Sequence, residues 1–222
     1  MCGITGVAWK TGATPVAMDT LARMTTAIAH RGPDDAGYYH SLYAPHGTGR
    51  DLAVVALPAA SITTAAGAAL GHRRLSIIDL AGGHQPLSNE DGTIWIAFNG
   101  EVYNYQELQP RLEQRGHRFH TASDTETIVH LYEEYGPDCV HQLRGMFAFA
   151  IWDARLQRLF LARDRLGKKP LLYRHDSQSL AFASELKSLL EIPGTPRSID
   201  PAAVDAFLTY QYVPHPHCIL SG

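Results

Sequence analysis

Apolar residues occur along the chain in short runs bounded by glycine, proline and other turn residues. Runs of this kind predict β-strands, and they cover residues 4–9, 75–80, 93–98, 146–152, 159–162, 171–173 and 180–183. The runs from residue 146 onward are joined by tight turns, which favours an antiparallel meander over alternating strand–helix–strand units. The segment 44–70, rich in Ala, Gly and Thr, is expected to be mostly loop, with one candidate strand at 53–57.

Helical spacing of apolar residues appears in four other segments. The predicted helices cover residues 17–28, 104–116, 125–135 and 201–212. The last one begins at Asp200-Pro201, a favourable N-cap followed by a proline in the first turn. Together with the strands, these helices predict an α+β fold with antiparallel sheets.

Composition narrows the class of protein. The 222 residues are 45% hydrophobic and 18% charged, which suits one sizeable folded domain. A net charge of −3 argues against a nucleic-acid or anionic-membrane partner. No apolar run reaches the ~20 residues of a membrane-spanning helix, and the N-terminus does not resemble a signal peptide, so we expect a soluble cytoplasmic domain.

The cysteines and histidines give no sign of a disulfide framework or a metal site. Three cysteines, Cys2, Cys139 and Cys218, are an odd number without C-x-x-C spacing. The twelve histidines match no metal-binding spacing, so no metal is assigned. We expect Cys139 to lie in the core and Cys218 in an extended proline-rich segment.

Cys2 is a candidate nucleophile. Removal of Met1 would leave an N-terminal cysteine, whose α-amine (pKa ~8) and thiol (pKa ~8.5) supply a base and a nucleophile in one residue. The alternative is a cysteine buried in the first strand, which is the commoner situation for a cysteine near a terminus. Cys2 alone does not decide between them.

Three further features could take part in chemistry at an amide. Asn99-Gly100, at the end of a predicted strand, offers an NH₂ and an N–H for an oxyanion, although an ordinary Asn-Gly turn is commoner. Arg74 could clamp a carboxylate or form a surface ion pair. Asp124 could bind an ammonium group or cap the helix that follows. Together with Cys2, these groups would suit a free α-amino acid with a side-chain amide, which is glutamine.

Several motifs in order resemble the class II glutamine amidotransferases, and in particular the N-terminal glutaminase domain of glutamine-hydrolysing asparagine synthetases. They include MCGITG, HRGPDD, GHRRLSIID and NGEVYN. The matching segments are residues 1–6, 30–35, 71–79, 99–104, 123–126, 145–150, 163–170, 183–187 and 210–214. The resemblance covers nearly the whole chain and implies the N-terminal-nucleophile fold, a four-layer α-β-β-α sandwich with two antiparallel sheets.

The resemblance also implies a role for each site residue. Cys2 would form a thioester with glutamine, and Asn99 with Gly100 would form the oxyanion hole. Arg74 would hold the α-carboxylate, and Glu101 with Asp124 the α-ammonium group. Backbone of Leu75, Ser76, Ile77 and Ile78 would line the pocket. Arg31 and Asp34 are expected to brace the loop near the nucleophile.

Residues 1–212 are expected to form the amidotransferase domain, and 213–222 a linker toward a C-terminal synthetase domain. No Ser-Gly-Gly-x-Asp-Ser loop for ATP occurs, so the resemblance implies ATP and Mg²⁺ only in that other domain and no cofactor in this one. The expected partners are L-glutamine and the synthetase domain, and a homodimer is left open. The alternatives are a glutaminase domain with another ammonia acceptor, or a non-catalytic regulatory domain of the same fold.

Overall fold

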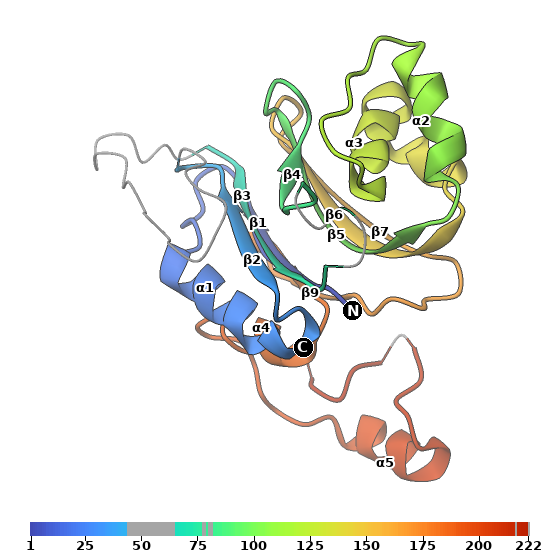
Figure 1. Cartoon of the computed structure of the whole chain (residues 1–222). Helices are drawn as coiled ribbons and strands as arrows, with labels where there is room; N and C mark the ends of the chain where they lie inside the picture. The colour runs from blue at the N-terminus through green and yellow to red at the C-terminus, as the bar shows by residue number, and fades with distance from the viewer. Residues whose placement is uncertain (44–64, 77–78, 80–81, 216, 222) are drawn as a thin grey trace.

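Two antiparallel β-sheets packed face to face form the centre of the computed structural model, which describes residues 1–43, 65–76, 79, 82–215 and 217–221 (Figure 1). One sheet has the strand order β2-β3-β1-β9-β8 and the other β4-β5-β6-β7. The strands are β1 (Gly3–Trp9), β2 (Asp35–His40), β3 (Gly67–Arg74), β4 (Leu87–Ser88), β5 (Ile94–Val102), β6 (Gly145–Asp153), β7 (Arg158–Arg163), β8 (Leu172–His175) and β9 (Ser179–Ala183).

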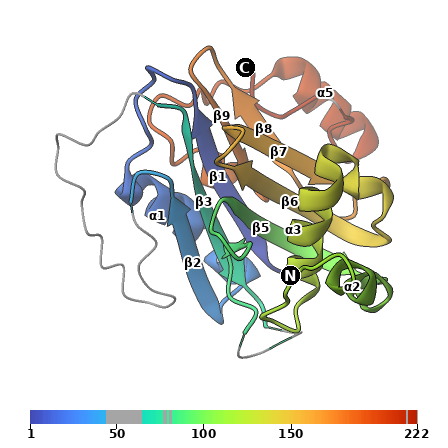
Figure 2. The ribbon, with the colours of Figure 1, turned by 90° about the horizontal axis from the view of Figure 1, so that it is seen from above.

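Helices cover the outer faces of the two sheets, as both views show (Figures 1 and 2). The α-helices are α1 (Met18–Ala27), α2 (Tyr105–Glu113), α3 (Asp124–Tyr135), α4 (Leu186–Leu189) and α5 (Pro201–Tyr210), and the 3₁₀ turns cover Ala29–Arg31 and Gly136–His141. Helices α1 and α4 pack on the five-stranded sheet, whereas α3 packs on the four-stranded sheet with α2 beside it. This layering confirms the predicted α-β-β-α sandwich.

The cores on the two sides of the four-stranded sheet differ in the size of their side chains. Between this sheet and its helices lie Ile, Leu, Val and Phe side chains, such as Ile128 and Phe149. Between the two sheets lie several alanines, among them Ala68, Ala97 and Ala148. The same layer also holds large side chains such as Trp152 and Phe182, and across it β1 and β3 contact β5.

The predicted strand at 75–80 is wrong at Leu75, Ser76 and Asp79, which lie in no strand, and its residues 77, 78 and 80 lie outside the described residues. The strand ends at Arg74 and begins at Gly67, inside the segment expected to be loop. This strand was not predicted because many of its residues are small or polar. At position 71, for example, a Cβ would lie 2.2 Å from the Thr25 hydroxyl of α1. The nearby helix therefore excludes a β-branched residue, the usual sign of a strand, at this position. The candidate strand at 53–57 lies outside the described residues.

The other elements confirm most of the pattern, with two differences. The predicted meander divides: β6 and β7 belong to one sheet and β8 and β9 to the other. The strand expected to end at Asn99-Gly100 continues to Val102.

All four predicted helices are present, and Asp200 caps α5 by accepting a hydrogen bond from the Ala202 N–H at 2.9 Å. Cys139 is fully buried, as expected.

Candidate active site

A cavity of about 290 Å³ lies where the start of β1, the ends of β3 and β5 and the first turn of α3 meet. Its walls come from segments far apart in the chain. They are Met1, Cys2, Arg74, Leu75, Gly83, Gln85, Phe98, Asn99, Gly100, Glu101, Ser123, Asp124, Thr125, Met146 and Lys169.

Cys2 is fixed at the cavity by contacts on both its thiol and its backbone. The Leu75 N–H points at Sγ at 3.4 Å, and the thiol lies 3.7 Å from the Leu75 carbonyl. The Arg31 guanidinium donates to the Cys2 carbonyl at 2.9 Å and forms an ion pair with Glu185 at 3.0 Å. Although burial opposes its charge, hydrogen bonds from Arg31, His30 and Lys187 lower the pKa of Glu185 to about 2. The expected bracing role of Arg31 is confirmed.

Asn99 carries a buried amide that lacks a hydrogen-bond partner among the described residues. Its side chain lines the cavity and is only 1% exposed, and Nδ2 donates to no described atom. A buried unpaired donor costs about 1–3 kcal/mol. An acceptor that enters the cavity can remove this cost, so Asn99 is suited to hold an oxygen of a ligand.

Gly100 is required by the close pairing of β5 with β6. A Cβ at this position would lie 2.3 Å from the Met146 carbonyl oxygen, closer than any side chain allows. The glycine therefore keeps the backbone open toward the cavity beside Asn99.

Arg74 and Asp124 are opposite charges on the cavity wall, each 5% exposed. The Arg74 guanidinium donates to the Asp79 carbonyl, and a Cβ on Gly83 would lie 2.5 Å from it, so this glycine makes room for the arginine. The Asp124 carboxylate accepts from the Val102 N–H at 2.8 Å. Burial raises the pKa of Asp124 to about 6, and the negative charge of Glu101 adds to the increase.

Asp124 is not the helix cap. Ser123 is the N-cap of α3, and its hydroxyl accepts from the Thr125 N–H at 3.2 Å. The Asp124 side chain instead turns to the end of β5, so the capping alternative for this residue is wrong.

Two polar side chains that sequence reasoning missed hold Phe98, which lines the same cavity as Cys2. Gln85 accepts from the Phe98 N–H at 2.7 Å and donates to the Thr125 hydroxyl at 3.2 Å. The buried His72 ring donates from Nε2 to the Phe98 carbonyl at 3.0 Å, and burial lowers its pKa to about 4, so the ring is neutral. His72 is followed by two arginines and Gln85 lies between a histidine and a proline, and no spacing rule assigns either side chain to Phe98.

The structure brings most of the predicted site residues together. Cys2, Arg74, Leu75, Asn99, Gly100, Glu101 and Asp124 all line the cavity. Ser76 is not among the lining residues; its N–H donates to Asp34 at 2.8 Å, in keeping with the bracing role expected for Asp34. Ile77 and Ile78 lie outside the described residues.

No helix of the described part of the chain is both long and apolar enough to cross a membrane.

The chain is similar to several curated proteins over most of its own length. It is 40% identical over 218 residues to asparagine synthetase [glutamine-hydrolyzing] 1 of Bacillus subtilis, which covers 97% of this chain and 30% of that protein. It is 34% identical to a putative asparagine synthetase of Methanocaldococcus jannaschii, over 99% of this chain and 41% of that protein. The chain thus spans less than half the length of these relatives.

A solved structure and a family match agree with these relatives. The glutamine phosphoribosylpyrophosphate amidotransferase of B. subtilis superposes with a TM-score of 0.63 at 26% identity, over 85% of this chain and 43% of that one. The family described as a glutamine amidotransferase domain matches residues 1–62 and 58–222. The resemblance read from the motifs is thereby confirmed, and the chain belongs to the glutamine amidotransferase domain family, class II.

Proposed function

We propose that this chain hydrolyses L-glutamine to L-glutamate and ammonia through a thioester on Cys2. The observation that carries the proposal is the unpartnered amide of Asn99 in the same cavity as the Cys2 thiol. Arg74 and Asp124 on the same wall offer opposite charges for the α-carboxylate and α-ammonium groups of a free amino acid. Family membership supports the assignment of glutamine.

The reaction requires the loss of Met1, which is 57% exposed and therefore accessible to a peptidase. The free α-amine of Cys2 then takes the thiol proton, and Sγ attacks the side-chain amide carbon of glutamine. The developing oxyanion accepts hydrogen bonds from Asn99 Nδ2 and the Gly100 N–H.

Breakdown of the tetrahedral intermediate releases ammonia. The C–N bond of the side-chain amide breaks as the protonated α-amine of Cys2 gives its proton to the leaving nitrogen. An acyl thioester on Cys2 remains. Water, deprotonated by the same amine, attacks the thioester, and the products are glutamate and the restored thiol. Each step keeps its protons within Cys2, water and substrate, so the chain needs no cofactor for this half-reaction.

We further propose that the ammonia serves asparagine formation in a protein that also carries a synthetase domain. The 40% identity to an asparagine synthetase, against 26% to the phosphoribosylpyrophosphate amidotransferase, supports this acceptor. ATP and Mg²⁺ would act in that other domain, with residues 213–222 as the linker toward it.

The first experiment measures glutamate release from glutamine without ATP, with the intact mass of the protein recorded beside it. We expect loss of Met1 and a steady release that falls at least ~10³-fold in Cys2→Ala. Cys218→Ala is the matched control, because it also removes a half-buried thiol, and should keep full activity. Equal activity in Cys2→Ala and the parent, or full activity with Met1 retained, would rule out the N-terminal thiol mechanism.

A further inference from the structure

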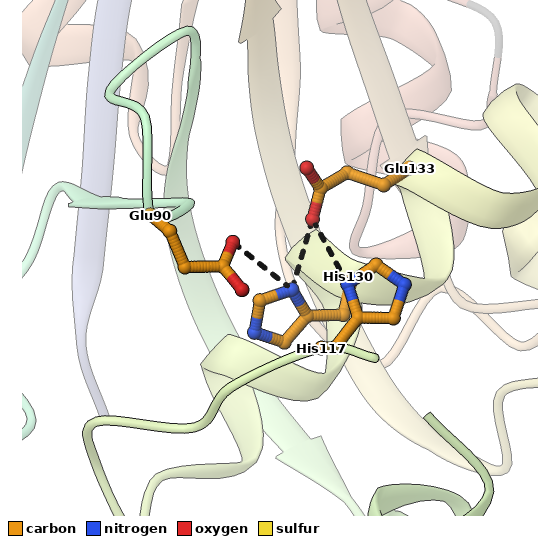
Figure 3. A group of neighbouring side chains, drawn as sticks. All are labelled: Glu90, His117, His130 and Glu133. Carbon is orange, nitrogen blue, oxygen red and sulfur yellow. Dashed lines mark hydrogen bonds and ion pairs between the residues drawn. The ribbon is translucent and has the colours of Figure 1, made fainter. Parts of the chain in front are cut away.

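Two histidines and two glutamates converge on the outer side of the four-stranded sheet, outside the active-site cavity. We call Glu90, His117, His130 and Glu133 the His-Glu cluster (Figure 3). Glu90 lies in the turn between β4 and β5, His117 follows α2, and the other two lie one turn apart on α3. None of the four lines the active-site cavity.

The facing atoms of the cluster lie close enough together to be ligands of one metal ion. Each residue offers one ligand atom, and the four atoms lie within 4.8 Å of one another. Glu133 Oε2 is 2.9 Å from His130 Nδ1 and 3.5 Å from His117 Nδ1, and Glu90 Oε2 is 3.9 Å from His130 Nδ1. Bonds of ~2.0–2.2 Å to zinc give tetrahedral edges of roughly 3.3–3.5 Å, so small shifts would complete the tetrahedron.

The remaining polar atoms of both glutamates are held from outside, which leaves the facing oxygens directed inward. Glu90 Oε1 accepts from the Arg118 N–H at 3.0 Å. Glu133 Oε1 accepts from the Asn89 amide at 2.8 Å. Each carboxylate is therefore oriented by a partner that does not compete for its inner oxygen.

Both histidines have a carboxylate at the ring nitrogen that faces away from the cluster. His117 Nε2 lies 3.0 Å from Glu134, and His130 Nε2 lies 3.7 Å from Glu126, which is too far for a hydrogen bond. A carboxylate on the far ring nitrogen, as at His117, is a usual second contact of a metal-bound histidine. His130 Nδ1 donates to Glu133 at 2.9 Å, and Zn²⁺ would displace the proton of this hydrogen bond. The His130 side chain is fully buried, so its nitrogen already lies away from water.

We propose that the His-Glu cluster is a structural Zn²⁺ site. Two imidazole nitrogens with two carboxylate oxygens suit zinc better than magnesium or calcium, which prefer oxygen alone. The two carboxylates balance the charge of one divalent cation. Four protein ligands leave no open position, so the metal would act in folding and not in chemistry.

The metal would act as a clamp on α3. It would join the β4–β5 turn and the loop after α2 to the second half of a helix whose first residue, Asp124, lines the active-site cavity. Spacings of 27, 13 and 3 residues between the four ligands match no sequence motif for zinc. For that reason the histidine pattern predicted no metal.

The test is a Zn²⁺ titration of the full chain after treatment with a chelator, with Co²⁺ as a spectroscopic substitute. We expect one Zn²⁺ per chain, Co²⁺ absorption of four-coordinate intensity, and a rise in Tm of about 5–10 °C at 100-fold excess over Kd. Glu90→Gln keeps the oxygen that accepts from Arg118 and removes the anionic ligand, and it should weaken binding at least tenfold. Glu90→Gln combined with His117→Gln should abolish it.

Matched variants exclude other sites for zinc. Glu113→Gln and His141→Gln remove the same kinds of side chain elsewhere and should bind zinc normally. Cys2→Ala and His217→Ala/Cys218→Ala test the thiol and the C-terminal segment, and should keep the stoichiometry at one. No stoichiometric binding by the folded parent, or equal affinity in the double cluster variant, would overturn the proposal.

Discussion

Two buried asparagines, Asn99 and Asn89, show how differently the protein treats the same side chain. Asn89 is 4% exposed and satisfies every part of its amide: its oxygen accepts from the Thr93 and Ile94 N–H groups and its nitrogen donates to Glu133. Asn99 is 1% exposed, and its nitrogen has no partner among the described residues. The first amide stabilises a turn, whereas the second leaves a buried donor unpaired at the cavity wall, as the proposed oxyanion role requires.

The largest expected effect comes from exchanging each asparagine for alanine. Asn99→Ala should lower kcat for glutamine hydrolysis about 10²–10³-fold, as expected for the loss of one oxyanion donor. It should not lower the free energy of unfolding, because the substitution also removes the destabilising unpaired donor. Asn89→Ala should do the opposite and lower the free energy of unfolding by about 2–4 kcal/mol, because two N–H groups lose their acceptor.

Steady-state kinetics and urea unfolding of both variants distinguish the two roles. A large stability loss in Asn99→Ala with unchanged kcat would mean that its amide is structural, and the contrast between the two asparagines would fail.

The pH dependence of stability and activity at Asp124 gives a second test of the contrast between residues of the proposed site and residues that stabilise the fold. Its pKa is raised from the ordinary 3.8 to about 6, chiefly by burial. The native chain therefore binds this proton more tightly than the unfolded chain, so the free energy of unfolding falls as pH rises from about 3.8 to about 6. Asp124→Asn removes this loss and should stabilise the protein by roughly 2–3 kcal/mol at pH 8, with no gain below pH 3.8.

The same substitution should harm substrate binding. In the parent, kcat/KM should show an acid limb near pH 6, where the carboxylate becomes protonated, and Asp124→Asn should lack that limb and have a higher KM. Thermal melts across pH 3–8 and kcat/KM profiles check both parts. A variant that is less stable at pH 8, with an unchanged KM, would assign Asp124 to the fold alone.

The smallest expected effect concerns the cap of α3. Ser123→Ala removes the acceptor of the Thr125 N–H and should cost about 1 kcal/mol of stability. Activity should change little, since Asp124 is held separately by the Val102 N–H. Ser123→Thr, which keeps the hydroxyl, should restore most of the stability in the same denaturant titration.

Sequence patterns predicted the fold well where apolar spacing decides the structure. The apolar positions of α1 repeat at helical spacing, and β6, which is buried on both faces, is a continuous apolar run. The strand β3 was not predicted, because its contact with α1 requires glycine at position 71 where a β-branched residue would have marked a strand. The assignment of each strand to one of the two sheets could not be predicted either. The sequence between β7 and β8 does not show that the chain passes from one sheet to the other there.

The candidate site was predictable only where a motif names the residue. Cys2, Asn99 and Asp124 belong to motifs, and the structure places all three on one cavity. Gln85 and His72 hold Phe98 in place. His72 lies in the GHRRLSIID motif, but no local pattern shows that its ring contacts a strand 26 residues away, and Gln85 belongs to none of the motifs. The His-Glu cluster likewise depends on the packing of a turn and a loop against α3, which no spacing rule shows.

The position of β1 has a consequence for the order of events during synthesis. Strand β1 pairs with residues 179–183 of β9, which are synthesised 170 to 178 residues after their partners, so its second neighbour arrives late. At 5–20 residues per second the delay is roughly 10–40 s. Under the proposed mechanism Met1 has to be removed, and a peptidase would have this interval to do so before β1 is paired on both sides. The same delay would keep the proposed site incomplete until nearly all of these residues are made.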